Sequence, residues 1–182
     1  MKCWPVPNSF SDSLPTEGDR GSYWEDRQIG FNCGVDIFCP FDSEIQVIES
    51  GIVLNISQYT QRKETSCFEN TMQCVIKCNS AMYKYTFLDK IYLKLGQKVH
   101  KGDVIGKCGL TVIKEKIKPS DPFYLRDIAH SNQTSYLHLE IFKSPIMEVR
   151  PYEFGNFLGD HKPKSLINPN LYLSGLSKQK QI

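Results

Sequence analysis

A histidine and nearby acidic residues in this chain are spaced so that they could bind a metal or transfer a proton. Residues 136–142 read YLHLEIF, in which polar and apolar side chains alternate. In a β-strand this period of two places Tyr136, His138 and Glu140 on one face. An imidazole there could bind zinc or exchange a proton near neutral pH. Alternatively, His138 could be a buried, satisfied partner of the carboxylate of Asp36.

Seven cysteines are a second set of potential metal ligands. Their number is odd, and their spacings match neither a zinc knuckle nor a compact disulfide framework. Cys74 and Cys78 share one face of a predicted strand, but at roughly 13 Å they are too far apart for a disulfide bond. We therefore expect most cysteines to be reduced and buried, as small hydrophobic side chains.

The segments that must position these residues are short and β-like. Residues 1–30 contain several prolines and glycines and are predicted to be an extended lead-in. Residues 58–70 and 114–131 are predicted to be polar or charged loops, and no stretch has a sustained helical period. This pattern favours an all-β fold, an antiparallel two-layer sheet or sandwich with long loops. Strands are expected at 34–39, 43–49, 51–56, 72–77, 82–88 and 136–142, the second and third joined at Ser50-Gly51.

Length and composition indicate one domain of ordinary character. The chain has 182 residues, 40% of them hydrophobic and 23% charged, which suffices for a core without support from metal or disulfide bonds. We divide it into the lead-in 1–30, a β domain at 31–175 and a flexible tail at 176–182. The net charge of +2 argues neither for nor against nucleic acid, which we do not expect as a partner. The basic pair Lys178 and Lys180 in the tail is expected to be solvated.

Targeting and membrane segments are not visible in the sequence. No stretch approaches the roughly 20 apolar residues of a membrane helix. The residues after Met1 contain no apolar run of the kind found in signal peptides. We expect a cytoplasmic protein if this N-terminus is native, and a secreted one if it has been trimmed.

Several blocks of sequence carry a family resemblance when read in order. Residues 18–40 end in NCGVDIFCP, 44–56 form a strand pair around a glycine, and 83–109 contain YTFL followed by GQKVHKG. The strand 136–142 contains YLH, and 166–173 read LINPNLYL. In this order the blocks resemble the motifs of the lysostaphin/LytM family of zinc endopeptidases. The resemblance implies a β fold of the duplicated hybrid-motif type, with long loops around a groove over an open sheet.

The resemblance also implies a zinc site. In active members of the family, a His-x-Gly-x-Asp motif and the second histidine of a His-x-His motif hold the metal. The first histidine of His-x-His and the histidine of a Tyr-x-His-Leu motif assist the attacking water. Three protein ligands leave a fourth position open for that water, whose pKa the metal lowers toward neutrality.

Three of these five positions are changed in this chain. Asn32 replaces the first zinc ligand, while Asp36 and His138 are retained. Phe87 and Tyr136 replace the two assisting histidines. An amide is a poor zinc ligand, phenylalanine transfers no proton, and tyrosine with a pKa near 10 is a weak base at neutral pH. The resemblance therefore implies a degenerate, non-catalytic member with a vestigial metal site, for which no cofactor is expected.

Two other functions are considered. An active zinc metalloendopeptidase with a rearranged site would need another ligand, and zinc would then be its cofactor. His130 is the best such ligand, because His100 is expected to be exposed in a turn and Cys39 to point away from Asp36. Cys33 is a further candidate by sequence position. A phosphocarrier-like domain would need two facing histidines, and only His138 is suitably placed.

Aromatic residues, 12% of the chain, suggest what a groove would bind. Aromatic rings form good contacts with sugars and peptide side chains. We predict Tyr136, Trp24 and Glu140 as groove-binding residues, and Phe31 and Phe87 as packing residues. The predicted ligand is a peptide, a glycan-peptide or a protein partner.

Overall fold

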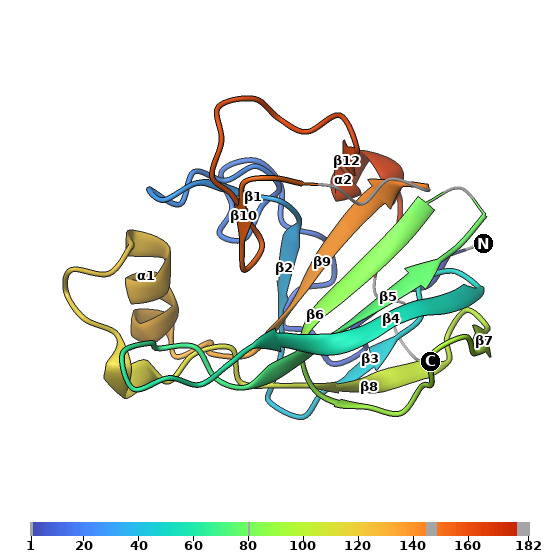
Figure 1. The fold of residues 1–182 in the computed structure, drawn as a ribbon, viewed down its shortest axis with the longest axis horizontal. Helices are drawn as coiled ribbons and strands as arrows, with labels where there is room; N and C mark the ends of the chain where they lie inside the picture. Colours follow the sequence, from blue (N-terminus) through green and yellow to red (C-terminus); the bar gives the residue numbers. More distant parts are fainter. Residues whose placement is uncertain (1, 80, 145–148, 178–182) are drawn as a thin grey trace.

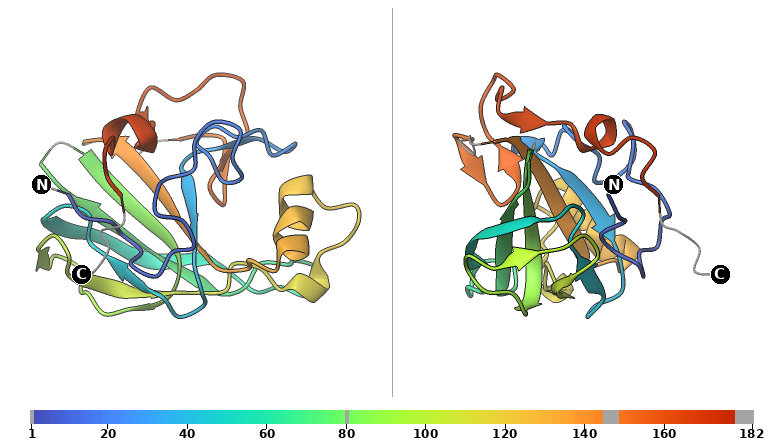
Figure 2. Two further views of the ribbon diagram at one scale, coloured as in Figure 1. Left: turned by 180° about the vertical axis from the view of Figure 1, so that it is seen from behind. Right: turned by 90° about the vertical axis from the view of Figure 1, so that its right-hand side faces the viewer.

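The computed structural model describes residues 2–79, 81–144 and 149–177, which form mainly antiparallel strands (Figures 1 and 2). The strands are β1 (Phe31–Asn32), β2 (Val35–Phe38), β3 (Glu44–Gln46), β4 (Gly51–Thr60), β5 (Thr71–Lys77), β6 (Ala81–Ile91), β7 (Lys98–Val99), β8 (Val104–Cys108), β9 (Tyr136–Lys143), β10 (Tyr152–Glu153), β11 (Asn156–Phe157) and β12 (Leu166–Ile167). Within the described residues, one sheet has nine strands along the order β12-β9-β6-β5-β4-β7, with β2, β3 and β8 also joined to it. A smaller sheet has the order β1-β11-β10. The predicted all-β fold is confirmed.

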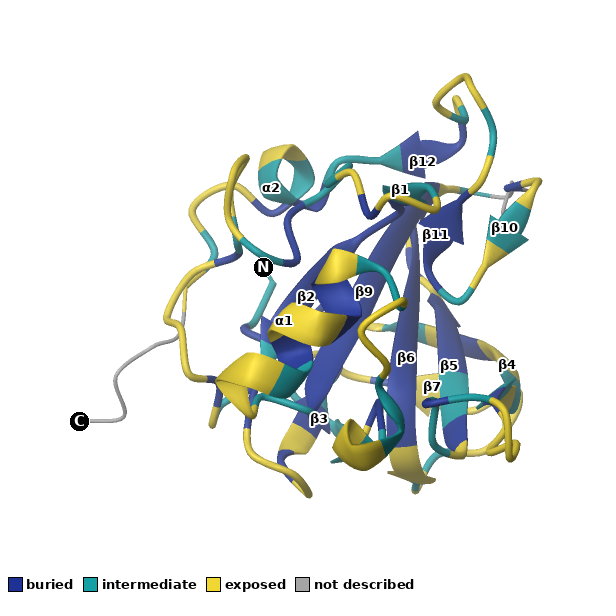
Figure 3. Cartoon of the chain, turned by 90° about the vertical axis from the view of Figure 1, so that its left-hand side faces the viewer, coloured by how far each residue is buried: buried dark blue, intermediate teal, exposed yellow. Residues whose placement is uncertain are grey.

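Strand β9 is the central element for the candidate site. It pairs with β6 on one side and with β2 and β12 on the other. The apolar side chains of its alternating pattern pack into the main core, as the period of two predicts. The opposite face is also buried, so the strand is covered on both sides, as the dark blue of β9 in Figure 3 shows. The core residues are Leu137, Leu139 and Ile141.

The N-terminal lead-in lies against the domain. Trp4, Val6 and Leu14 are buried in the main core, although they precede the first strand by many residues. Further along, an isolated bridge pairs Asp26 with Phe31 and folds the lead-in back on β1. The lead-in therefore supplies both apolar packing and, as described below, charge.

A helix occupies part of the segment that the sequence predicts as the loop 114–131. A single 3-10 turn, η1 (Lys114–Lys116), is followed by α1 (Phe123–Ser131). Three residues of α1 are buried, at a spacing that places them on one side of the helix, against Phe87 and Tyr136. The sequence pattern does not reveal this helix, because its apolar residues repeat over only one helical turn. These buried residues are Tyr124, Leu125 and Ile128.

The two strands predicted on either side of Ser50-Gly51 follow one another in the chain as expected, but they have different pairing partners. The segments 43–49 and 51–56 contain β3 and β4, but β3 pairs with β8, whereas β4 pairs with β5 and β7. β4 also runs on to Thr60, which shortens the predicted loop. The predicted hairpin of 72–77 and 82–88 is confirmed as β5 and β6.

The ends of the chain add little to the site. A short helix, α2 (Pro169–Tyr172), follows β12. Residues 178–182 of the predicted tail, with Lys178 and Lys180, and Ser80 of the predicted turn lie outside the described residues. All seven cysteines are free thiols, and six of them are buried. Over the described ranges, no helix is long and apolar enough to cross a bilayer.

Candidate functional site

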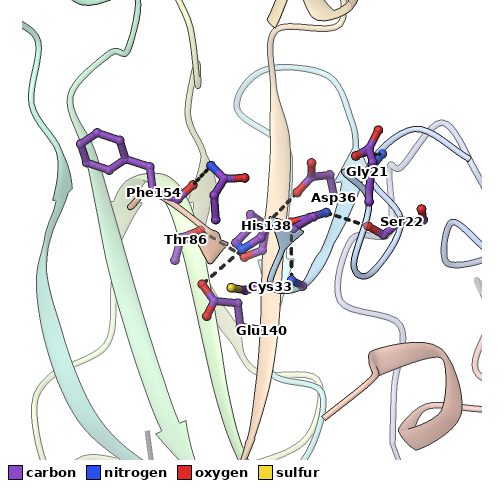
Figure 4. Close-up of polar contacts among 12 residues, drawn as sticks. Gly21, Ser22, Cys33, Asp36, Thr86, His138, Glu140 and Phe154 are labelled. Atoms are coloured by element: carbon purple, nitrogen blue, oxygen red, sulfur yellow. Dashed lines mark hydrogen bonds and ion pairs between the residues drawn. The ribbon is translucent and has the colours of Figure 1, made fainter. Parts of the chain in front are cut away.

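His138 lies at the centre of the candidate site, between two carboxylates (Figure 4). Strand pairing sets Asp36 on β2 directly beside His138 on β9. The distance from His138 Nδ1 to Asp36 Oδ1 is 2.7 Å, and that from Nε2 to Glu140 Oε1 is 3.2 Å. All three side chains are buried. The buried pair of His138 and Asp36, which the sequence left as an alternative to metal binding, is therefore confirmed.

Arg27, from the lead-in, is the counter-ion of Asp36. Its guanidinium forms an ion pair with Asp36 Oδ2, and its Nε lies 3.3 Å from Glu25 Oε2. Arg27 is only 2% exposed and also lies over the ring of Tyr124, 4.8 Å from the ring centroid. Burial would lower the pKa of Arg27, but the neighbouring anions, Asp36 first, raise it. A permanent positive charge therefore sits on the carboxylate that the family uses as a zinc ligand.

Lys84, on β6, is the counter-ion of Glu140. Its Nζ lies 2.9 Å from Glu140 Oε1, which also accepts a hydrogen bond from the hydroxyl of Tyr152. Burial alone would raise the pKa of Glu140, but Lys84, His138 and Tyr152 lower it to about 2. Glu140 is therefore ionised at neutral pH, although it is fully buried.

The protonation of His138 follows from its two partners. Burial would lower the pKa of His138, but the hydrogen bonds and charges of Asp36 and Glu140 raise it. A neutral imidazole donates one hydrogen bond, whereas the imidazolium donates from both nitrogens. Because both ring nitrogens face carboxylate oxygens, the imidazolium is the form that satisfies both contacts. The site is thus a chain of buried ions that runs through Arg27, Asp36, His138, Glu140 and Lys84.

Asn32 is engaged with the backbone. Its amide nitrogen donates to the carbonyl of Ser22 at 2.9 Å, and its amide oxygen lies 3.5 Å from the nitrogen of Gly34. The side chain is fully buried. In this arrangement the amide supports the loop before β2 and makes no hydrogen bond to Asp36 or His138 in the part of the chain that the structure describes.

These residues do not fit a zinc ion. Tetrahedral ligands about 2.0–2.1 Å from zinc lie about 3.3 Å from one another, whereas Asp36 and His138 are in direct contact at 2.7 Å. The second oxygen of Asp36 is held by Arg27. A Cβ atom at Gly155 would lie 2.7 Å from His138 Nε2, so backbone covers that nitrogen. Among the described residues, no group of three His, Cys, Asp or Glu side chains is arranged to hold a metal.

Phe87 and Tyr136, at the positions of the assisting histidines, form an aromatic wall beside His138. Their ring centroids are 5.1 Å apart, and Phe87 lies 6.2 Å from the imidazole centroid. Both are at most 2% exposed. Burial raises the pKa of Tyr136 well above its ordinary value, so its hydroxyl stays protonated. Neither residue can act as a base near neutral pH.

The candidate rescue ligands lie in other surroundings. His130 is on α1 and lines a surface cavity of about 340 Å³ with Lys114. The side chain of His100 is 85% exposed, as predicted for a turn. Cys39 is buried in the main core, and Cys33 is buried in a separate cluster with Phe157. No hydrogen bond or ion pair joins any of the four to His138 within the described segments.

The three predicted groove residues lie in three different places. Glu140 lines a cavity of about 560 Å³ beside β10. Trp24 lines another, of about 770 Å³, where it stacks on Phe31 with a centroid distance of 4.9 Å. Tyr136 is 1% exposed and belongs to the cluster under α1, so it lines neither of these two cavities. Contact of any of them with a ligand stays a prediction.

Sequence reasoning missed both cations of the site. The sequence could have indicated Lys84, because this residue lies between Tyr83 and Tyr85 in a predicted strand and shares a face with Thr86. The sequence gives no such indication for Arg27, because the lead-in has no periodic pattern that would place Arg27 beside β2. Both were found only through tertiary contacts.

Known proteins are similar to this chain in sequence pattern and in fold. The sequence profile described as peptidase family M23 matches residues 30–145. CbpA from L. salivarius REN has a TM-score of 0.54 and 19% identity, over 93% of this chain and 94% of that one. Lysostaphin, solved by NMR, has a TM-score of 0.53 and 16% identity, over 97% of this chain and 57% of that one.

A further structure of lysostaphin, the antimicrobial peptidase from Staphylococcus simulans, has a TM-score of 0.50 and 15% identity, over 89% of this chain. The match covers 49% of that protein, so this chain spans about half its length. At these identities the structural likeness concerns the fold alone. Among curated proteins, none matches this sequence.

Proposed function

Because this chain belongs to peptidase family M23, we propose that it uses the peptidase fold as a binding domain and has lost zinc-dependent hydrolysis. The ligand is a peptide, a glycan-peptide or a protein partner. It binds in the cavity beside Glu140, which is the part of the candidate site that opens to the surface.

The ion pair between Arg27 and Asp36 is the single observation that carries this proposal. A guanidinium is protonated at every pH that a protein meets, so it is a permanent substitute for a metal's positive charge on this carboxylate. Zinc could reach Asp36 only by expelling Arg27 and separating Asp36 from His138. Breaking one partner out of a buried pair costs about 3–5 kcal/mol, which opposes metal entry.

The residues at the three changed motif positions, Asn32, Phe87 and Tyr136, also support the loss of hydrolysis. Asn32 donates to a backbone carbonyl, and the side chains at the two assisting positions are buried aromatic rings. Hydrolysis needs an activated water and a group that transfers protons near neutral pH. The charged groups around His138 are instead paired with one another.

Metal content and peptide cleavage together test the proposal. Protein purified without chelators is analysed by elemental mass spectrometry, as wild type and as Asp36→Ala, and is incubated with a glycine-rich peptide. We expect far less than one zinc per chain in both proteins and no cleavage products by mass spectrometry. Zinc-loaded lysostaphin, run in parallel, shows that both assays detect an active enzyme.

The opposite result is equally defined. About one zinc per chain that disappears in Asp36→Ala, together with cleavage that disappears in His138→Ala, would overturn the proposal. The chain would then be a zinc peptidase with a rearranged site, and His130 would be the first residue to test as the third ligand.

A further inference from the structure

One oxygen of Glu140 has no partner. Oε1 receives Lys84, Tyr152 and His138, whereas Oε2 is buried without a hydrogen bond to any residue that the structure describes. A buried carboxylate oxygen without a hydrogen-bond donor is energetically costly, and more so when the group is charged. Glu140 also lines the cavity of about 560 Å³. Glu140 is therefore a wall residue of this cavity, and its Oε2 is a buried acceptor there that lacks a donor among the described residues.

The floor of this cavity is a row of side chains across four strands. Strand registers place Asn55 on β4 beside Val75 on β5, Val75 beside Lys84 on β6, and Lys84 beside Glu140 on β9. All four line the cavity, as does Phe154, which follows β10. The volume lies within the range of roughly 300–1,000 Å³ that is usual for small-molecule sites.

We propose that this cavity binds a neutral saccharide, one of whose hydroxyl groups donates a hydrogen bond to Glu140 Oε2. This inference rests on the proposed function and, of its three ligand types, selects the glycan-peptide, whose saccharide part would occupy this cavity. Three features of the cavity favour a neutral saccharide: the charges that line it, the type of hydrogen bond it can form, and the shape of its floor.

Charge favours a neutral ligand. Lys84 Nζ lies 2.9 Å from Glu140 Oε1, so a cation at Oε2 would be repelled by the ammonium in a poorly hydrated site. An anion would face Glu140 itself, and Glu153 also lines the cavity. A hydroxyl group can donate to the carboxylate without either conflict.

The shape of the floor favours a ring over an extended peptide. β5 and β6 are each paired on both sides, so their backbone groups are already used. Peptides that bind a sheet by strand addition need a free edge, and this cavity lies on a face. A ligand here must meet side chains. The amides of Asn55 and Gln73, which line the cavity, both donate and accept, as hydroxyl groups do.

The aromatic side chain completes the match. Phe154 lines the cavity, is half-buried, and packs against Phe68 with ring centroids 5.1 Å apart. The apolar face of a sugar ring can lie on such a side chain while the hydroxyl groups at the ring edge reach polar groups. Phe154 has a positive φ of 43°, so glycine is tolerated at this position.

Ligand-observed and protein-observed NMR test the inference with the neutral trisaccharides chitotriose and maltotriose. Wild type is compared with Phe154→Gly and Gln73→Ala, neither of which removes a charged group, and with Leu171→Ala as a control on exposed α2. We expect at least one trisaccharide to bind and each cavity variant to weaken binding by about tenfold or more, or 1.4 kcal/mol. The control is expected to bind as wild type does.

The alternative outcomes separate this inference from the function on which it rests. If neither trisaccharide binds, or if binding is unaffected by both cavity variants, the saccharide inference is overturned. If triglycine binds instead and Phe154→Gly abolishes that binding, the saccharide inference is overturned while groove binding stands. Stoichiometric zinc and peptide cleavage by wild type would overturn the proposed function, whatever the trisaccharides do.

Discussion

The two faces of strand β9 are buried to a similar degree by opposite means. On one face, Leu137, Leu139 and Ile141 pack among apolar side chains of the main core. On the other, His138 and Glu140 are fully buried among charged partners. Apolar burial is stabilising wherever it occurs, whereas a buried ion is stable only with its particular charged partners. The second face is therefore the more sensitive to single substitutions.

The largest expected effect is on Arg27. Arg27→Met leaves Oδ2 of the buried Asp36 carboxylate without its guanidinium partner, and we expect the free energy of unfolding to fall by about 3–5 kcal/mol. Denaturant unfolding measures it. Arg62→Met is the matched control, because the Arg62 side chain is 57% exposed in its ion pair with Glu69, and such pairs contribute about 0–1 kcal/mol. A loss below 1 kcal/mol in Arg27→Met would mean that water or another cation replaces the guanidinium.

Leu139→Ala tests the apolar face of the same strand. Leu139 is fully buried, and removing three carbons from such a site costs about 2–5 kcal/mol. The same unfolding assay applies, at several salt concentrations. We expect the loss for Leu139→Ala to be independent of salt. A loss that changes strongly with salt would show that the two faces are not energetically distinct.

Acid titration should act on the charged face alone. The pKa of Glu140 falls from an ordinary 4.5 to about 2 in the folded protein. Its contribution is therefore complete above about pH 4.5 and is lost as the pH falls toward 2. Unfolding measured from pH 6 to pH 2 should show this decline, and the decline should be smaller in Glu140→Gln.

His138 gives the opposite slope at higher pH. Its pKa is raised above the ordinary 6.5, so its contribution is complete below that pH and is lost as the pH rises through the folded value. NMR titration of the imidazole would measure that value. A His138 pKa below 6.5 would contradict the imidazolium between Asp36 and Glu140.

The smallest expected effect is a regained metal affinity. Asn32→His restores the residue that the family uses, but Arg27 still holds Asp36. We expect the double variant Arg27→Met, Asn32→His to bind zinc at least about tenfold more tightly than either single variant. Calorimetry measures the affinities. Equal affinity in Asn32→His alone would show that Arg27 does not oppose the metal.

The predictable part of this molecule is the part encoded by local period and by motif order. The alternation in 136–142 set the two faces of β9 correctly, and the motif blocks identified the family. The pair of Asp36 and His138 is one of the two alternatives that the sequence leaves open for these residues, and the structure contains it.

The unpredicted part depends on contacts between distant segments. Arg27 reaches Asp36 from a lead-in without periodicity, and α1 has too few apolar residues to reveal a helix by pattern. Tyr136, one of the predicted groove residues, packs under α1 and beside Phe87, and its contact with a ligand stays a prediction. A local sequence pattern predicts which side chains share a face of a strand or helix, whereas the residues that cover that face depend on tertiary packing.

Gly155 makes the solvation of His138 depend on a backbone contact. In the turn between β10 and β11, Gly155 lies so close to the imidazole that no side chain would fit between them. The carbonyl oxygen of Gly155 accepts a hydrogen bond from the backbone nitrogen of Cys33 at 2.8 Å. Lifting this turn would admit water to the ions and weaken every charge interaction around them. The amide hydrogen of Cys33 should therefore exchange with solvent only when the whole ion chain is wetted, which makes it a single-atom reporter of that opening.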